Sequence, residues 1–506
     1  MKFHHRSRSR MSSSWQTRLS GALVAGALIA TGPFAAYSQP VGIPSMGVAS
    51  AAELSPGVER TLGDAIMEQG RRDPSYIADP DVLQYLTEMG QRLAAHASTA
   101  VGRINVFALR DPQVNAFALP GGYIGVNSGL VVTAESESEL ASVVAHEIAH
   151  VLQRHIARGM TQRAQSNHAM IATLAGTLLA ALSGSADLAM GVAAFGQAAA
   201  VDRQLGFSRQ AEQEADRMGL DMMTRAGYDP AGMARMFERL DSASRLNQGA
   251  GGNTYATTHP LSVQRLADAQ NRVMRADRKA NDSSDAFWYV RAKLRIEQAR
   301  AGQALRSAEE FLRAETRQAK GVQRSAAWYG LAYSAWKRRD YGQAQQALDQ
   351  ARATGSAGPQ LAALEIAISL GRGDADAAVR LGESAARRWP GSQGVALAYV
   401  DALQSAGRHD VAVGHLQGLI KQWPEVPSLW QLQARSQEVL GRRAAARRSM
   451  ATYYELTGAL PAAVEQLQQA RAMSSDFYEQ SELDVRIRQL RERLESDRQL
   501  LERFKK

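Results

Sequence analysis

Apolar residues recur at different intervals along the chain, which predicts helices first and then a short sheet. Between residues 51 and 100 they return every three or four positions, the spacing of amphipathic helices. The stretches INVFAL at 104 to 109 and AFALPGGYIGV at 116 to 126 are instead rich in strand-forming residues. We expect them to form a small sheet that bends at the Pro-Gly-Gly of residues 120 to 122.

Helical spacing returns after the predicted sheet. The first helix is expected to begin near Thr133, a favourable N-cap residue, and to run through the sequence HEIAH to about Arg158. Residues 169 to 200 are rich in Ala, Leu and Gly and are divided by SGSAD, which predicts a buried helical hairpin; a segment that touches a membrane or a partner is the alternative. A further helix is predicted over residues 208 to 227, and a Gly-rich loop over residues 241 to 258.

Beyond residue 285 the sequence repeats with a period of 34 residues. Two series of small residues keep this interval: Gly373, Gly407 and Gly441, and Ala344, Ala378, Ala412 and Ala446. A glycine between two amphipathic stretches at this period is typical of tetratricopeptide repeats, which stack helix hairpins into a solenoid. The charged final segment carries an apolar seam formed by Leu483, Ile487, Leu490 and Leu494. We expect this segment to cap the solenoid, and pairing with another helix is the alternative.

Residues 1–38 have the features of a secretory signal peptide. Five basic residues precede a short apolar run from Gly21 to Ala30, and the small residues Ala36 and Ser38 suit cleavage after Ser38. The run is shorter than the roughly 20 residues of a spanning helix, although an uncleaved anchor is the alternative. Removal of this segment would lower the formal net charge from +9 to +4.

Cysteine and charge usage exclude several classes of site. The chain has no cysteine, so it has neither disulfides nor a lipid-anchored cysteine, and a metal site must use histidines and carboxylates. No dense stripe of Lys and Arg is interleaved with aromatic residues, and we therefore expect no nucleic-acid partner. Together with the predicted export, these features indicate the periplasm.

The stretch VVAHEIAHVLQRH, residues 143 to 155, carries the clearest candidate chemistry. His146 and His150 are four positions apart, so on a helix they are neighbours on one face and can bind one metal ion. A pair of satisfied core histidines is the alternative. A catalytic zinc ion takes three protein ligands and keeps one position for water, so a third ligand must lie further along the chain.

The sequence AEQEAD at residues 211 to 216 offers that third ligand. Glu212 and Asp216 lie on one helical face, so we predict Glu212 as the ligand and Asp216 as the acceptor for the outer N–H of a ligand histidine. Alternatively, these acids only solvate a helix beside Arg209 and Arg217.

HEIAH followed by SRQAEQEADRMG resembles the zinc metallopeptidases of the HtpX and mitochondrial Oma type, whose pattern is HExxH with a later ExxAD. With its signal peptide and repeats, the chain is more similar still to the periplasmic β-barrel assembly-enhancing proteases. The resemblance includes residues 115 to 130 and THPLSVQRLADA at 258 to 269. It implies one zinc ion per chain, bound by His146, His150 and Glu212, with Glu147 as the catalytic glutamate.

The predicted fold class is mainly α. An α+β HExxH metallopeptidase domain with a small sheet would be followed by an α-solenoid of tetratricopeptide-like helix hairpins. The predicted domains are a signal peptide at 1–38, a zinc metallopeptidase domain at 39–280, and a repeat domain with a C-terminal capping helix at 281–506.

The resemblance and the motif together predict how the site would work. Glu147 would act as general base toward a metal-activated water. An extended peptide could add to a strand edge lined by Asn115, Phe117 and the glycine pair Gly121 and Gly122. An ordinary strand and turn is the alternative for each of these residues.

Two residues after the Gly-rich loop are further candidates. His259 could occupy the open metal position and keep the enzyme latent, or it could be a helix-start histidine with Thr258 as cap. Arg265 could stabilise a developing oxyanion in the same cleft.

Two functions of different classes follow. The first is a zinc endopeptidase with chaperone-like activity that cleaves unfolded or misassembled outer-membrane proteins. The second is a repeat-based chaperone or adaptor for outer-membrane protein assembly, with little proteolysis. The resemblance implies barrel-assembly machinery as a partner of the repeats, and peripheral contact with the outer membrane is a further expectation.

Overall fold

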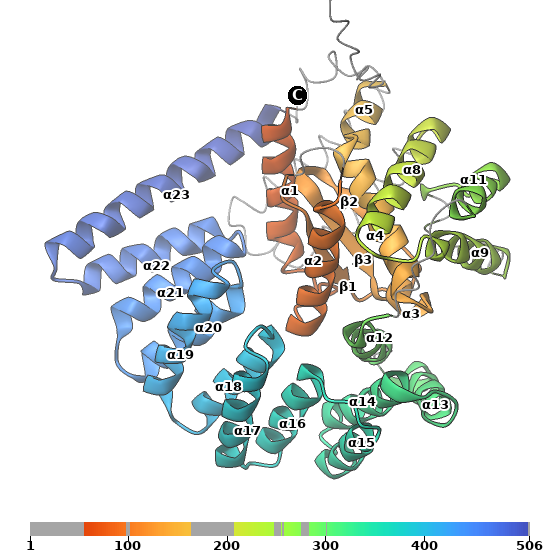
Figure 1. The fold of residues 1–506 in the computed structure, drawn as a ribbon. Helices are drawn as coiled ribbons and strands as arrows, with labels where there is room; N and C mark the ends of the chain where they lie inside the picture. The colour runs from red at the N-terminus through yellow and green to blue at the C-terminus, as the bar shows by residue number, and fades with distance from the viewer. Residues whose placement is uncertain are drawn as a thin grey trace, which may run out of the picture. The chain divides into compact units, whose positions relative to one another are not determined.

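The computed structural model describes residues 55–97, 102–162, 207–246, 255, 258–274, 283–299 and 301–503. The predicted signal peptide, the apolar hairpin at 169–200 and most of the Gly-rich loop lie outside these residues. Over the described ranges the chain forms helices around one three-stranded sheet, followed by a long series of helix hairpins (Figure 1). Among the helices described, none combines the length and the apolar character needed to cross a membrane.

The sheet forms where the strand-like stretches predict it. Strands β1 (Asn105–Leu109), β2 (Ala116–Leu119) and β3 (Tyr123–Asn127) lie in the order β1-β3-β2, with β3 parallel to β1 and antiparallel to β2. The predicted bend is the short 3-10 turn η1 (Pro120–Gly122). Gly121 and Gly122 have φ of 79° and 89°, which glycine adopts without strain. Because β3 lies in the middle of the sheet, strand β2 lies at one edge of it.

Eight helices of the described ranges surround this sheet: α1 (Pro56–Gly70), α2 (Pro80–Ala94), α3 (Ser128–Thr133), α4 (Glu137–Leu152), α5 (His155–Gln162), α8 (Arg209–Arg225), α9 (Ala231–Leu246) and α11 (Val263–Val273). The core lies between α4, the sheet and α2, where Val144, Ile124 and Leu86 are fully buried. Helix α4 is buried on nearly all sides, since it packs on α8 and α9 as well.

The predicted bounds of the histidine helix are wrong at both ends. Thr133 is the last residue of α3, and the N-cap of α4 is Ser136, whose hydroxyl accepts a hydrogen bond from the backbone N–H of Glu139 at 3.3 Å. The extended backbone of Ala134, with ψ of 131°, separates the two helices. At the other end, α4 stops at Leu152 and a separate helix begins at His155.

The repeat region consists of twelve helices within the described residues: α12 (Asp285–Gln298), α13 (Gly302–Gln318), α14 (Gly321–Lys337), α15 (Tyr341–Ala353), α16 (Pro359–Gly371), α17 (Ala375–Arg388), α18 (Gln393–Ser405), α19 (His409–Gln422), α20 (Pro427–Val439), α21 (Arg443–Leu456), α22 (Leu460–Met473) and α23 (Phe477–Arg503).

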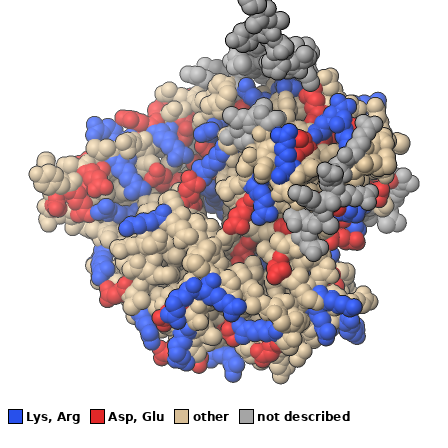
Figure 2. Space-filling view, viewed as in Figure 1, with Lys and Arg blue, Asp and Glu red and all other residues tan. Residues whose placement is uncertain are grey.

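The 34-residue period has a structural basis in both series of small residues. The three glycines have φ between 70° and 84° and end the first helix of a hairpin, whereas the four alanines are at most 3% exposed. The period also places ion pairs between repeats, Arg408 with Asp376 at 2.6 Å and Arg442 with Asp410 at 2.7 Å. On the face drawn in Figure 2, basic side chains stand among acidic ones and broad uncharged areas.

Helix α12 belongs to two cores at once. Phe287 and Leu294 pack into the core that contains α4, whereas Tyr289 and Ile296 pack with the first repeats. At the other end of the array, the apolar seam of α23 packs against α22, as a capping helix would. Arg493 of α23 also reaches Glu68 of α1 at 2.7 Å. The first and last helices of the repeat region therefore both contact the sheet-containing domain.

Candidate metal centre

Helix α4 presents both motif histidines to α8. His146 and His150 are one turn apart and at most 1% exposed. Gly219 of α8 allows the two helices to approach closely, because a Cβ on this glycine would lie 3.1 Å from the backbone nitrogen of His146. This approach brings Glu212, in the first turn of α8, next to the two imidazoles.

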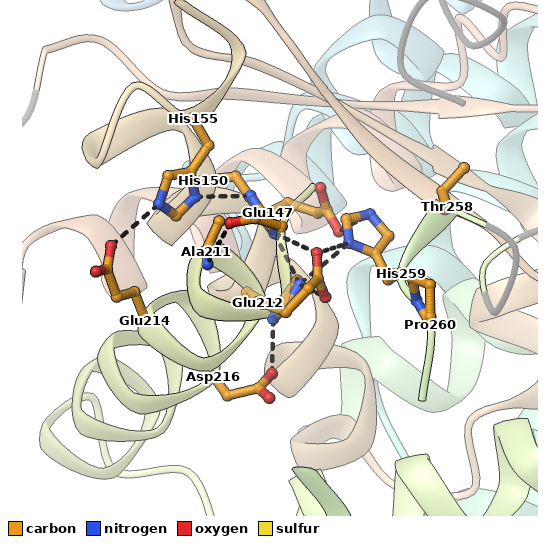
Figure 3. Close-up of polar contacts among 12 residues, drawn as sticks. Glu147, His150, His155, Ala211, Glu212, Glu214, Asp216, Thr258, His259 and Pro260 are labelled. Carbon is orange, nitrogen blue, oxygen red and sulfur yellow. Dashed lines mark hydrogen bonds and ion pairs between the residues drawn. The ribbon is translucent and has the colours of Figure 1, made fainter. Parts of the chain in front are cut away.

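A third segment supplies another histidine to the same place. His259 precedes α11, is fully buried, and is held by a hydrogen bond from its backbone N–H to the carbonyl of Tyr255 at 2.8 Å. Figure 3 shows the side chains of Glu212 and His259 pointing toward one another. The Nδ1 atom of His259 lies 3.0 Å from Glu212 Oε1.

The separations among these four groups fit ligands of one ion. Donor atoms about 2.0–2.1 Å from a tetrahedral zinc ion are about 3.3 Å from one another. His146 Nε2 lies 2.9 Å from His150 Nε2 and 3.3 Å from His259 Nδ1, while Glu212 oxygens lie 3.5 Å from each of the first two nitrogens. Ligand atoms from all four residues lie within 4.8 Å of one another. The donor set of three imidazoles and one carboxylate suits zinc.

Glu147 lies beside this cluster, where His259 is its one ion-pair partner within the described residues. The side chain is fully buried, and within the described residues neither carboxylate oxygen has a hydrogen-bond partner. His259 Nε2 is 3.5 Å from its Oε1. A buried carboxylate without hydrogen-bond partners is costly, so its place is best explained by a further group, such as a water molecule beside a bound ion.

An outer pair of charges holds the cluster in place. Asp216 Oδ1 lies 3.0 Å from His146 Nδ1, on the side of the ring that faces away from the other ligand groups. Arg265 donates to both Asp216 oxygens, at 2.7 and 2.8 Å, and its Nη1 lies 2.7 Å from Glu212 Oε2. These contacts fix the orientation of one histidine and of the carboxylate at the centre.

The charges shift the pKa values of the ligand groups in opposite directions. Burial would lower the pKa of His146, but Asp216 and Glu212 outweigh it and raise that pKa to about 9. His150 differs: burial and its histidine neighbours hold its pKa well below the usual value. The pKa of Glu212 would be raised by burial, yet the nearby histidines His259 and His146 bring it well below normal. Burial would lower the pKa of His259 too, but Glu212 and Glu147 outweigh it and raise that pKa. A metal would therefore compete with protons at both His146 and His259.

The predicted site residues fall into two groups. The structure brings together His146, Glu147, His150, Glu212, Asp216, His259 and Arg265. The alternative role of Thr258 as a helix cap is wrong, because α11 begins at Val263 with Ser262 as its N-cap. Arg265 makes its contacts with Asp216, Glu212 and the carbonyls of residues 259 and 260. Its oxyanion role stays a prediction and would require some of these contacts to be released.

The residues predicted to line a substrate edge are packed within the domain. Asn115 is buried next to β2, and Phe117 points into an apolar cluster under α1. A Cβ on Gly122 would lie 2.1 Å from the carbonyl oxygen of Arg103, and one on Gly121 3.0 Å from the Cα of Arg60. The two glycines therefore allow a close packing of η1, and their place along a substrate edge stays a prediction.

Three aromatic rings around the cluster carry no role in the sequence patterns. Tyr255 stacks on His259 with 4.7 Å between ring centroids, Phe207 lies 4.0 Å from His150, and His155 lies 4.8 Å from His150. Tyr255 and Phe207 come from segments without helical or strand periodicity. His155 stands within the quoted stretch, and its position five residues after His150 was the available signal.

Two parts of the chain match known families. Residues 80–273 match the model described as Peptidase family M48, and residues 369–436 match a tetratricopeptide repeat. The first match contains every residue of the cluster, and the second lies within the helix hairpins.

Known proteins are similar to this chain over most or part of its length. The "Beta-barrel assembly-enhancing protease" of Escherichia coli K12 is 31% identical over 468 residues, which cover 92% of this chain and 92% of that protein. The protein of the same name from Yersinia pestis is 30% identical and covers 96% of this chain and 99% of its own length. "Metalloprotease LoiP" of Escherichia coli K12 is 30% identical over 44% of this chain and 82% of its own.

Proposed function

The chain belongs to the family of β-barrel assembly-enhancing proteases, and on that premise we propose that it is a zinc endopeptidase that cleaves unfolded or misassembled outer-membrane proteins in the periplasm. Membership confirms the predicted resemblance, the metallopeptidase class and the fold class of a peptidase domain followed by repeats. The observation that carries the proposal is the buried convergence of His146, His150 and Glu212 beside Glu147, whose carboxylate accepts no hydrogen bond within the described residues.

In this proposal, each residue of the cluster has a separate role. His146 and His150, each through Nε2, and the carboxylate of Glu212 would hold one zinc ion per chain. Bound zinc supplies a Lewis acid, which lowers the pKa of a water molecule toward about 7 and polarises the scissile carbonyl. Glu147 would take the proton of the attacking water on a carboxylate oxygen and deliver it to the nitrogen of the leaving amine. Asp216 keeps the proton of His146 at Nδ1.

Comparison of Glu147→Gln with the wild type tests this division. The variant should bind zinc as the wild type does and cleave an unfolded barrel protein at least about 100-fold more slowly, because only the proton acceptor is lost. Zinc content by elemental analysis and cleavage of an unfolded barrel protein are measured together. Glu135→Gln, on an exposed side chain (65%), is the matched control and should leave both unchanged.

The same comparison addresses the alternative function. A repeat-based chaperone or adaptor for barrel assembly does not need Glu147, so Glu147→Gln would keep its full effect on assembly. The repeats are suited to protein partners because a solenoid offers an extended binding surface, and barrel-assembly machinery is the partner proposed here. Equal cleavage by wild type and Glu147→Gln would remove the peptidase proposal and leave this alternative.

His259 is proposed as a latch on the same site. Its Nδ1 lies among the ligand atoms, where it would fill the position that a water molecule needs. The backbone N–H of its neighbour Tyr255 donates to the carbonyl of Val114 at 3.2 Å, just before the edge strand β2. The segment thus occupies the start of the edge to which a peptide would add, and cleavage would require it to move.

Replacement of the latch should raise activity. We expect His259→Ala to cleave an unfolded substrate several-fold faster than the wild type, because the fourth donor no longer competes with water. The proteolytic rate at saturating zinc is the measurement. Unchanged or lower activity with an intact zinc content would contradict the latch while leaving the peptidase proposal in place.

Export is part of the proposal as well. The predicted signal peptide at residues 1–38, cleaved near Ser38, would deliver the chain to the periplasm, where unfolded barrel proteins are met before assembly. N-terminal sequencing of the protein recovered from the periplasmic fraction tests both points. Peripheral contact with the outer membrane stays a prediction.

A further inference from the structure

His150 has a second buried histidine on the side away from the ligand cluster. Its Nδ1 lies 2.9 Å from the Nδ1 of His155, and the Nε2 of His155 lies 3.4 Å from Glu214 Oε2 (Figure 3). His155 is 3% exposed, whereas the Glu214 side chain is 33% exposed. The three side chains therefore form a row from the centre of the cluster to the surface of α8.

The helix is interrupted between His150 and His155. In an uninterrupted helix, His155 would lie about 140° around the axis from His150, because each residue advances about 100°. Instead α4 stops at Leu152, and Arg154 adopts a φ of 52°, which is uncommon for a residue other than glycine. Arg154 is held by Glu59 of α1 at 3.3 Å. This turn returns the ring of His155 toward His150.

The position of one proton follows from the geometry. The Nε2 atom of His150 faces His146 and Glu212, so it must be unprotonated in order to bind a metal. A neutral imidazole then carries its proton at Nδ1. Only one of the two facing Nδ1 atoms can be protonated, so His150 donates and His155 accepts.

The second proton follows in the same way. Because His155 accepts at Nδ1, its own proton is at Nε2, where it points to the carboxylate of Glu214. Gln210 and Arg158 hold this carboxylate, at 3.2 and 3.5 Å. Both imidazoles remain neutral, and each has the tautomer that the next residue requires.

We propose that His155 is a positioning residue for the metal site: it fixes the tautomer and ring orientation of His150 and connects this ligand to Glu214. The inference rests on the proposed zinc site at His146, His150 and Glu212. The two histidine ligands are then supported in different ways. His146 has a carboxylate directly behind it, whereas His150 has a neutral imidazole and, beyond it, a partly exposed carboxylate.

A matched pair of substitutions separates this role from simple packing. Asparagine and leucine have nearly the same size and shape, but only asparagine has an oxygen that can accept the Nδ1–H of His150. A packing role predicts that His155→Leu is at least as good as His155→Asn. A positioning role predicts the reverse, because loss of an outer hydrogen-bond partner weakens metal binding by about 10–100-fold.

The experiment measures zinc affinity by competition with a chromophoric chelator, using the full mature chain. We expect His155→Leu to bind zinc about 10–100-fold more weakly than the wild type, and His155→Asn to recover most of that loss. Zinc binding by His155→Leu as tight as wild type, or no better binding by His155→Asn, overturns the inference. A wild type that binds no zinc overturns the proposed function, and with it this inference.

A measurement on the wild type needs no variant and decides the question if the substituted chains do not fold. Nitrogen NMR of the zinc-loaded protein, labelled with 15N at histidine, reports which ring nitrogen carries each proton. We expect the proton of His155 at Nε2 and that of His150 at Nδ1. A proton at Nδ1 of His155 would contradict the proposal.

Discussion

Two of the buried charge clusters in the described part of the chain differ in how their charges are compensated. In the first, Lys293 of α12 is held by Asp79 and Asp81 at the start of α2, at 2.7 and 2.8 Å. In the metal centre, His146 and His150 turn their Nε2 atoms toward one another at 2.9 Å, and Glu147 has no hydrogen-bond partner within the described ranges. The first cluster is complete in itself, whereas the second needs another group.

The difference indicates which cluster is structural and which is functional. Buried charges that contribute only to the fold are normally paired, because an unpaired one costs several kcal/mol. Lys293 joins the repeats to α2 and satisfies this rule, and the two aspartates raise its pKa well above normal although burial alone would lower it. The metal centre satisfies this rule less well at Glu147, which accepts no hydrogen bond within the described residues and has only His259, at 3.5 Å, as a charged neighbour. The proposed chemistry requires this carboxylate to act as a base.

The largest effect is expected from removal of the carboxylate ligand. Glu212→Ala should bind zinc far more weakly, by more than the roughly 100-fold that the loss of an outer partner produces, and should lose proteolysis with it. Zinc content and cleavage of an unfolded protein are the measurements. Asp221→Ala, on the same helix and 45% exposed, is the control and should behave as wild type. Full zinc affinity in Glu212→Ala would show that the ligand set is wrong.

The cluster of Lys293, Asp79 and Asp81 can be disrupted by removing its single cation. Lys293→Met should lower the free energy of unfolding by about 3–5 kcal/mol, because it leaves two neighbouring aspartates without their cation. Denaturant unfolding measures this loss. Lys421→Met removes an exposed lysine at the end of α19 and should cost less than about 1 kcal/mol.

A triple variant then tests the reason for the loss. Adding Asp79→Asn and Asp81→Asn to Lys293→Met removes all three charges, and asparagine at position 79 can still act as the N-cap of α2. This variant should recover much of the stability of Lys293→Met. A triple variant less stable than the single one would mean that the cost does not come from uncompensated charge.

The smallest effect concerns another buried acid, Glu68, which has an ion-pair partner that compensates its charge only in part. It pairs with Arg493 of the capping helix and packs against Gly458, where a Cβ would lie 1.9 Å from its own. Burial outweighs the arginine and raises the pKa of Glu68 from 4.5 to about 7. The folded state therefore binds this proton more tightly than the unfolded chain does.

The sign of the pH dependence follows from that difference. As pH rises from about 4.5 to about 7, the folded protein should lose up to about 3 kcal/mol relative to Glu68→Gln, and the difference should stay constant above pH 7. Thermal unfolding midpoints of the two proteins between pH 5 and 8 measure it. A difference that does not change with pH would mean that Glu68 is ionised throughout this range.

Local patterns in the sequence predicted the parts of the molecule that depend on neighbours along the chain. The two histidines share a helix face because they are four residues apart, and the positive φ of Gly373 and its equivalents follows from a turn at each repeat. The bounds of α4 could not be predicted as well, because Thr133 and Ser136 are both acceptable caps. The choice between them depended on how α3 packs against α12.

Contacts between distant segments had no comparable signal. Asp79 and Lys293 are 214 positions apart, and no periodicity relates them. The return of His155 toward His150 depends on the backbone of Arg154, whose partner Glu59 is 95 positions away. Packing between distant segments determines which of these residues meet. In the sequence, each of them looks like an ordinary surface charge or histidine.

By itself, the sequence determined the type of chemistry and the type of architecture: an HExxH helix with a later carboxylate, and repeats of 34 residues. Spacing is sufficient for both, because a helix or a repeat fixes which residues are neighbours. Only the tertiary structure decided which groups stand behind the ligands, that His259 reaches the same centre, and that α12 and α23 join the repeats to the peptidase domain. These features depend on the close approach of separate segments, which the order of residues along the chain does not reveal.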